Sequence, residues 1–186
     1  MADRNALITN LASVETLGST TVICTDKTGT LTENEMTVVT YELAGGSVEV
    51  TGTGLDSEGL FRHGNQELDE PRDSVLSEAL EVGVLCNNAS VAEDDGETNV
   101  TGDPMEVALL IAGKKGGLDR AALLEEMPER REVAFDPSVK MMATYHDRSG
   151  EYAVAVKGAP EAIIESSTRL VTEDGTEPLS TEKKAE

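Results

Sequence analysis

The stretch VICTDKTGTLT, residues 22–32, constrains the fold more than any other part of the sequence. Its first residues are apolar and mostly β-branched, and such a run, bounded by Gly18 and a polar turn, predicts a short buried strand over residues 20–25. The residues that follow are small, hydroxylated or glycine, which is typical of a turn that holds an anion. Asp26 is therefore expected at the carboxyl end of a strand, where ligands and catalytic groups collect in open α/β sheets.

The rest of the chain predicts helices alternating with strands that turn tightly into one another. We expect a helical N-terminal segment, a hairpin over residues 36–54 around Gly45-Gly46, and exposed polar loops over 55–72 and 91–102. We also expect helices over 73–86, 103–115 and 119–127, strands in REVAF, KMMATYH and EYAVAVK, a helix from Ala159, and polar sequence after Ser167. This order predicts an α+β fold in which helices flank an antiparallel sheet.

The charge of the chain excludes two classes of partner. It carries 36 acidic residues against 15 basic ones, a net charge of −21, so nucleic acid and anionic membrane surfaces would repel it. Few lysines and few aromatic residues accompany these acids, which is typical of proteins from salt-loving organisms; the alternative is an ordinary acidic domain. No apolar run approaches the roughly 18 residues of a membrane helix, so we expect a segment that does not insert into a membrane.

The cysteines and histidines show no metal-binding or disulfide pattern. Cys24 and Cys86 lie in apolar contexts far apart in the sequence, which predicts two buried free thiols in a reducing compartment. His63 and His146 are isolated, and we expect each at the surface or at a sheet edge.

Four segments in order resemble motifs of one family. DKTGTLT is similar to the phosphorylation motif of P-type ATPases, ion pumps that carry the γ-phosphate of ATP on an aspartate. The segments GDPMEVAL (102–109), AFDPSVKMM (134–142) and KGAPE (157–161) resemble three ATP-site motifs of that family's nucleotide-binding domain. Residues 5–24 resemble the stretch that leads from a membrane-linked helix into the phosphorylation domain. The pattern resembles the calcium and sodium/potassium branch of the family.

This resemblance implies two domains. Residues 1–35 would begin a Rossmann-like phosphorylation domain of the haloacid-dehalogenase type, with its first strand ending at DKTGT. Residues 36–186 would form the nucleotide-binding domain without its C-terminal part. The partners expected are ATP and the remaining parts of a pump, namely the second half of the phosphorylation domain, the actuator domain and the membrane helices.

The turn after residue 25 has residues suited to phosphoryl transfer. Asp26 is expected to be both the nucleophile and a Mg²⁺ ligand, because in-line positioning and charge neutralisation dominate this reaction. Thr28 and Thr30 can offer hydroxyl and backbone groups to the phosphate, and Gly29 allows close approach of the backbone. The resemblance implies that the main-chain carbonyl of Thr28 also binds the metal. Lys27 either supplies positive charge to the phosphate or faces solvent.

The other three motifs are expected to form an adenine pocket. Phe135 offers a face for stacking on a purine, unless it is a core residue at a strand end. Lys157, just before Gly158, is expected to extend its ammonium into the pocket, and Lys140 to lie nearer the phosphates. The resemblance places Glu106 near the adenine amino group, whereas the third position of a helix also suits a capping carboxylate.

The sequence also departs from the family pattern. Pro137 stands where many relatives carry a basic or polar residue, and nothing matches the second half of the phosphorylation site. We therefore expect the ATP-binding, aspartyl-phosphate-forming segment of a cation pump at the cytoplasmic face of a membrane, inactive by itself. The alternatives are a stand-alone ATP-binding or regulatory module and a haloacid-dehalogenase-type phosphatase, although Thr28 breaks the DxD pattern of the latter. The transported ion cannot be read from these residues.

Overall fold

The computed structural model describes residues 18–68, 75–94 and 97–184. Residues 1–34 and residues 35–186 form two separate units. The helix expected for the N-terminal segment falls on residues 1–17, and the N-cap expected at Asp73 falls on residues 69–74, so both predictions lie outside the described residues.

The described part of the first unit, residues 18–34, contains no strand, so the strand expected over residues 20–25 is wrong. Residues 20–25 are irregular and exposed, and the first strand of a Rossmann-like sheet is therefore not present here. A strand forms when its backbone N–H and C=O groups pair with a neighbouring strand, and no strand of the described residues pairs with this run. Cys24 is exposed for the same reason, whereas Cys86 is buried as expected.

A four-stranded antiparallel sheet in the order β1-β2-β3-β4 opens the second unit. Its strands are β1 (Thr40–Leu43), β2 (Gly46–Val50), β3 (Phe61–His63) and β4 (Gln66–Leu68). Leu43 pairs with Gly46, which confirms the first hairpin. Of the exposed loop expected over residues 55–72, residues 55–60 contain no helix or strand, as expected, whereas β3 and β4 form a second hairpin over residues 61–68; residues 69–72 lie outside the described residues. Gly64, at a φ of 60°, allows the tight turn of this hairpin, and Phe61 is only 2% exposed in the core.

Three helices and a third hairpin follow. The helices α2 (Val75–Leu85), α3 (Pro104–Lys115) and α4 (Arg120–Glu126) confirm the three expected there. Asp103 and Asp119 cap α3 and α4 by accepting from the amides of Met105 and Ala122. The loop expected over residues 91–102 is instead a hairpin of β5 (Ser90–Asp94) and β6 (Glu97–Thr101). Its strands are held by backbone hydrogen bonds, which a polar composition does not reveal.

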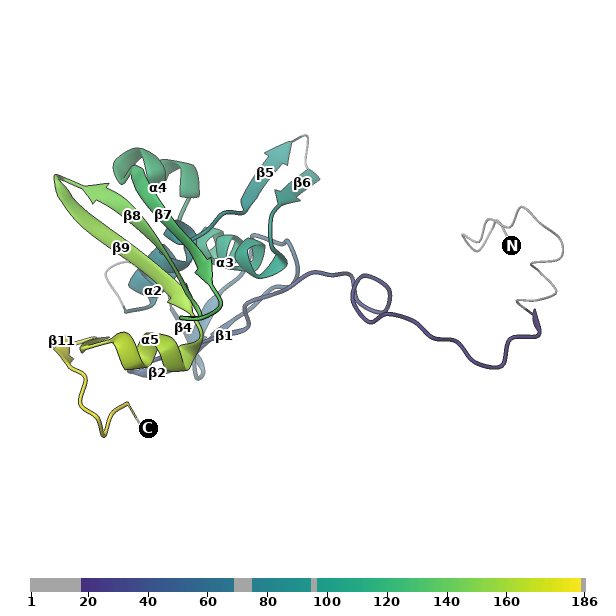
Figure 1. Ribbon diagram of the computed structural model, residues 1–186, viewed down its shortest axis with the longest axis horizontal. Coiled ribbons are helices and arrows are strands. Elements are labelled where there is room, and N and C mark those ends of the chain that lie inside the picture. Colours follow the sequence, from purple (N-terminus) through teal and green to yellow (C-terminus); the bar gives the residue numbers. More distant parts are fainter. Residues whose placement is uncertain (1–17, 69–74, 95–96, 185–186) are drawn as a thin grey trace. The chain divides into compact units, whose positions relative to one another are not determined.

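The longest strands form a three-stranded antiparallel sheet in the order β7-β8-β9 (Figure 1). They are β7 (Glu129–Asp136), β8 (Met141–Arg148) and β9 (Glu151–Gly158), and they confirm the predicted strands. The helix α5 (Pro160–Ser166) follows as expected. In the polar sequence after Ser167, β10 (Arg169–Thr172) and β11 (Gly175–Pro178) form a last hairpin.

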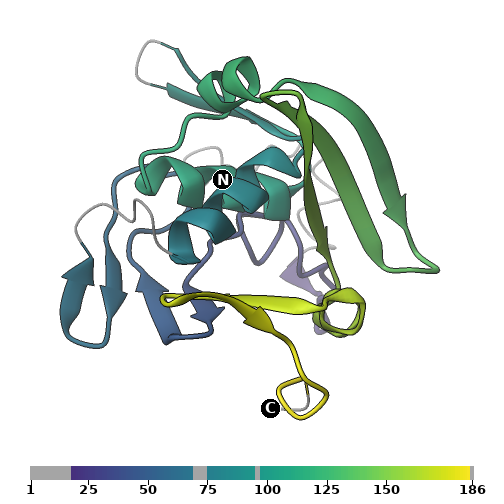
Figure 2. The same cartoon turned by 90° about the vertical axis from the view of Figure 1, so that its left-hand side faces the viewer.

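The core of the second unit lies between the helices and the sheets. Figure 2 shows α2 and α3 on one side of the β7-β8-β9 sheet. Leu85 and Cys86 at the end of α2 pack with Met142 of β8 and Ala155 of β9. His146 is fully buried in this layer rather than exposed, and its ring nitrogens contact the carbonyl of Met127 and the hydroxyl of Thr144. Among the helices of the described residues, none has the length and hydropathy of a membrane-crossing helix.

The excess of acidic residues predicts a chain that salt stabilises. With 36 acidic and 15 basic residues, 36 − 15 = 21 carboxylates lack a basic partner even if every cation is paired. At about 0.01 M salt the screening length is ~30 Å, so carboxylates repel one another across the unit, and at about 1 M it falls to ~3 Å. We expect the melting temperature, followed by circular dichroism, to rise with KCl and to rise less with sucrose, which is excluded from the surface but does not screen charge. A melting temperature that is flat or falls with KCl would contradict the halophile interpretation.

Candidate functional site

The DKTGT segment folds as a closed turn. The carbonyl of Lys27 accepts from the amides of Leu31 and Thr32, at 3.0 and 3.2 Å. Gly29 lies in the left-handed region at a φ of 72°, which explains why glycine suits this position. The carboxylate of Asp26 accepts from the amide of Thr28 at 3.4 Å and is exposed. Lys27, Thr28 and Thr30 are exposed too, so the turn presents an accessible carboxylate beside hydroxyl and amide groups.

Phe135 lies in a β-bulge near the end of β7. Val133 pairs with Ala143 and Asp136 with Met141, so Ala134 and Phe135 together oppose the single residue Met142. A bulge of this kind re-aims a side chain relative to the regular alternation of a strand. Phe135 is 56% exposed, so it is not a core residue, and its ring is available for stacking.

Lys157 lies across the sheet from the bulge, because Met142 pairs with it on the other side. Its Nζ donates to Oε1 of Glu106 at 2.5 Å, and both side chains are nearly buried, at 17% and 11% exposure. The other oxygen, Oε2 of Glu106, accepts from the amide of Asn88 at 3.2 Å. A nearly buried carboxylate is thus held between an ammonium and a backbone N–H.

The contacts of Glu106 test the interpretation of this residue as a capping-box carboxylate. Asp103 Oδ1 caps α3 through the amide of Met105 at 2.9 Å. Both carboxylate oxygens of Glu106 point to partners from other elements, Lys157 of β9 and Asn88 after α2, instead of returning to the start of α3. Glu106 therefore serves the junction of three elements, and the capping-box interpretation is wrong.

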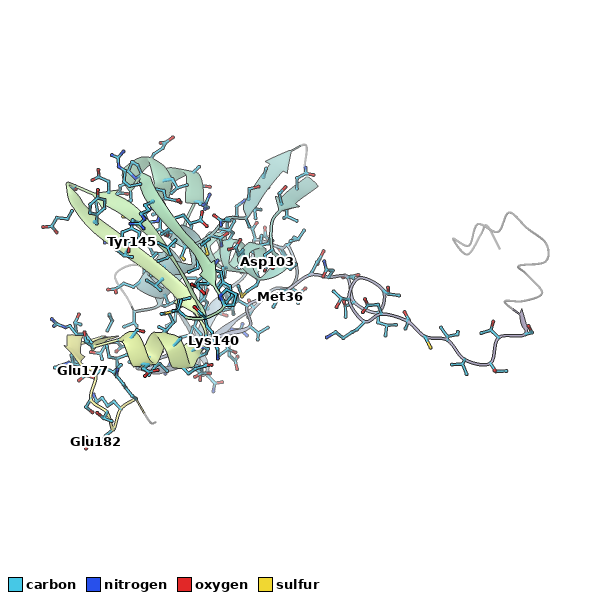
Figure 3. All side chains as sticks on the ribbon, in the orientation of Figure 1. Met36, Asp103, Lys140, Tyr145, Glu177 and Glu182 are labelled. Atoms are coloured by element: carbon cyan, nitrogen blue, oxygen red, sulfur yellow. The ribbon has the colours of Figure 1, made fainter. Side chains whose placement is uncertain are left out.

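Lys140 and Gly158 lie side by side at the same end of the sheet. The amide of Ala159 donates to the carbonyl of Lys140 at 3.0 Å. A Cβ at Gly158 would lie 2.2 Å from that carbonyl oxygen, so only glycine allows the two backbones to come this close. Lys140, at a φ of 56°, extends an exposed ammonium to Oε1 of Glu161 at 3.1 Å. Figure 3 shows Lys140 near the start of α5, far from Tyr145 along the strand.

Two acidic residues near Lys140 have pKa values below their usual range. The hydroxyl and amide of Ser138 donate to Asp136 and lower the pKa of its carboxyl. The pKa of the Glu161 carboxyl is lowered first by the backbone amide of Glu161 itself and then by the ammonium of Lys140. Pro137 lies between Asp136 and Ser138 in the turn that joins β7 to β8. The hydrogen bonds from Ser138 to the Asp136 carboxylate hold this turn.

The structure brings together five of the residues singled out in the sequence. Glu106, Phe135, Lys140, Lys157 and Gly158 all lie at the end of the sheet where β7 and β9 finish and β8 begins. The other four, Asp26, Lys27, Thr28 and Thr30, belong to the first unit.

Sequence reasoning missed Asn87 and Asn88. Asn87 is fully buried, and its Nδ2 donates to the carbonyls of Gly83 and Glu106 while its Oδ1 accepts from the amide of Ala89. The available signal was two asparagines directly after the apolar stripe of a helix. A separate cavity of about 220 Å³ lies among apolar residues such as Val84 and Leu110, and it shares no lining residue with the sheet end.

Comparison with known proteins places these observations in a family. The family model described as the cytoplasmic domain N of P-type ATPases matches residues 75–186. A cation-transporting ATPase of Synechocystis is 39% identical over 180 residues, which is 94% of this chain and 20% of that protein. A calcium-transporting ATPase of Bacillus subtilis is 34% identical over 187 residues, or 100% of this chain and 21% of that protein. Calcium-transporting ATPase 1 of Lactococcus lactis is 37% identical over 185 residues, or 99% and 19%. The chain spans about a fifth of the length of these relatives.

Proposed function

This chain belongs to the P-type ATPase family, and we propose that it is the ATP-binding and phosphate-accepting segment of a cation-transporting ATPase. The family model and the relatives support the family and the N domain. The observation that carries the proposal for ATP is the meeting of Phe135, Glu106, Lys140 and Lys157 at one end of the β7-β8-β9 sheet. We place the segment at the cytoplasmic face of a membrane, with the rest of the pump as its partner.

The base of the nucleotide is held by Phe135 and Glu106. The exposed ring of Phe135 stacks on the purine. A carboxylate accepts hydrogen bonds and does not donate them, so the side chain of Glu106, paired with Lys157, suits the exocyclic amino group of adenine. Each carboxylate oxygen keeps a free lone pair after its contact with Lys157 or Asn88, because a carboxylate oxygen can accept more than one hydrogen bond.

The phosphate end of the nucleotide is attracted by local positive charge. In a chain with a net charge of −21, an anion binds only where cations offset the general repulsion. The side chain of Lys140 is 56% exposed, and its ammonium is paired with an exposed carboxylate, Glu161, which a phosphate can replace at little cost.

Asp26 accepts the phosphate in this proposal. Its exposed carboxylate follows an irregular segment and sits beside the amide of Thr28, in a turn that also offers the hydroxyl of Thr30. Attack by an Asp26 oxygen on the γ-phosphorus forms an acyl phosphate and releases ADP. Lys27 adds positive charge beside this anionic centre.

The oxygen donors of the turn fit Mg²⁺. The carboxylate of Asp26 and the main-chain carbonyl of Thr28 are the hard ligands that this ion takes, commonly one or two from protein with the rest from phosphate and water. Within residues 18–68, 75–94 and 97–184 no group of three or more His, Cys, Asp or Glu could hold a metal ion by itself, which agrees with a metal shared with the nucleotide. When bound, the ion neutralises charge on the phosphate oxygens.

Replacing Phe135 with alanine should weaken binding of ATP, ADP and AMP by one common factor, because all three share the adenine ring. Loss of a stack costs ~1 to 3 kcal/mol, or roughly 5- to 150-fold in Kd. Calorimetric or fluorescence titration measures the three Kd values. The variant Phe135→Tyr, which keeps an aromatic ring, should retain most of the affinity. Tyr152→Ala, which removes an exposed ring from the same sheet, is the matched control and should change little. If Asp26→Ala lowers ADP affinity more than Phe135→Ala does, the proposed pocket is wrong.

A further inference from the structure

Two residues just after α2, Asn87 and Asn88, donate hydrogen bonds to Glu106. The Nδ2 of Asn87 donates to the main-chain carbonyl of Glu106 at 2.9 Å, and the amide of Asn88 donates to its carboxylate Oε2 at 3.2 Å. These two bonds join consecutive residues of one segment to the backbone and the side chain of a single residue. Rotation of the Glu106 side chain is therefore restricted at both ends.

Asn87 is itself held on every side. Besides its bond to Glu106, its amide donates to the carbonyl of Gly83 at 3.1 Å and accepts from the amide of Ala89 at 2.8 Å. Its main-chain carbonyl accepts from Nη2 of Arg120, whose Nε also donates to the carbonyl of Val84. A fully buried side chain with three hydrogen bonds fixes its neighbours because breaking any one leaves a buried polar group unpaired.

The consequence reaches Lys157. With Oε2 of Glu106 turned to Asn88, the other oxygen, Oε1, faces Nζ of Lys157. The segment after α2 thus helps to set the plane of the Glu106 carboxylate, and with it the direction of the remaining lone pairs.

We propose that Asn87 is a positioning residue that orients the Glu106 carboxylate and so determines the preference of the site for adenine over a base with a carbonyl at the same position. This inference rests on the proposed function, since it assumes that Glu106 receives the base. Asn87 does not touch the nucleotide and acts through Asn88 and Glu106.

The substitution Asn87→Ser separates this role from the local turn. A serine hydroxyl can still accept from the amide of Ala89 two residues on, as asparagine does, but it is too short to reach the carbonyl of Glu106. The readout is the ratio of the Kd values for ITP and ATP, because inosine carries a carbonyl where adenine carries its amino group. A partly unfolded variant loses affinity for both nucleotides equally, so the ratio does not report stability.

We expect Asn87→Ser to lower the ITP/ATP ratio by about 3- to 10-fold, the range for one hydrogen bond of ordinary strength. Asn99→Ser, the same substitution at an exposed position of β6, should leave the ratio at the value of the unchanged chain. Glu106→Gln should lower the ratio at least as far as Asn87→Ser, because its amide no longer acts only as an acceptor.

Each result has one meaning. If Glu106→Gln lowers the ratio and Asn87→Ser does not, the role of Asn87 is overturned and the proposed adenine site stands. If Glu106→Gln leaves the ratio unchanged, the placement of the base fails and the inference fails with it. If Asn87→Ser does not fold, Arg120→Met is used instead, because it removes the hydrogen bond from Arg120 to the main-chain carbonyl of Asn87. A fall in the ITP/ATP ratio of that variant supports the positioning role of Asn87, and an unchanged ratio overturns it.

Discussion

Asp26→Asn should abolish phosphorylation from ATP in a full-length pump that carries this segment. An asparagine amide has almost the shape of the carboxylate but does not attack phosphorus, so no acyl phosphate forms. The measurement is acid-stable ³²P incorporation from labelled ATP, with lability to hydroxylamine to identify an acyl phosphate. A suitable protein is made by exchanging this segment for the matching one of the Synechocystis relative.

The matched control is Asp174→Asn, which makes the same change in the exposed turn between β10 and β11. It should retain the label. Label that persists on Asp26→Asn at the unchanged level would refute the assignment of Asp26. The isolated chain should show no ATP hydrolysis above background in either form.

Lys157→Met should destabilise the second unit by about 3 kcal/mol, the low end of the cost of removing one partner of a buried ion pair. The cause is the carboxylate of Glu106, which is 11% exposed and would be left without its counter-charge. For a chain of this length, that loss lowers the melting temperature by roughly 6 to 12 °C. Urea unfolding, at a salt concentration where the chain is folded, measures the loss of unfolding free energy.

A second ion pair of the same kind provides the control. Lys183 and Glu177 also meet at 2.5 Å, but their side chains are 43% and 41% exposed. Lys183→Met should therefore cost no more than about 1 kcal/mol. The double variant Glu106→Gln/Lys157→Met removes both charges and should recover at least half of the stability that Lys157→Met loses. Equal losses for Lys157→Met and Lys183→Met would mean that the Glu106–Lys157 pair is not desolvated.

Sequence reasoning succeeded where a short segment contains the whole physical cause. Asp103, Pro104 and the apolar residues after them are sufficient to start α3, because capping and helix geometry act within one turn. Alternation in KMMATYH and EYAVAVK, with a tight turn at Ser149-Gly150, is sufficient for the hairpin of β8 and β9. The ordered motifs were also sufficient to identify the family.

It failed where a strand depends on a partner. The run at residues 20–25 has the composition of a strand, but no strand of the described residues pairs with it. The hairpins β3-β4, β5-β6 and β10-β11 are rich in polar residues, and their strands exist because their backbones pair. Composition records the environment of side chains and does not record backbone pairing.

The sequence by itself determined which residue types are present for the proposed chemistry: a carboxylate in a glycine-containing turn, and Phe135, Lys140, Lys157 and Glu106 in ordered motifs. Only the tertiary structure decided how they are used. Phe135 lies in a β-bulge of an exposed strand, the contact between β9 and α3 pairs Lys157 with Glu106 across 51 positions of the chain, and Asn87, after the end of α2, donates to the main-chain carbonyl of Glu106. Each of these depends on contacts between elements far apart in sequence, and such contacts are set by packing, which no local pattern records.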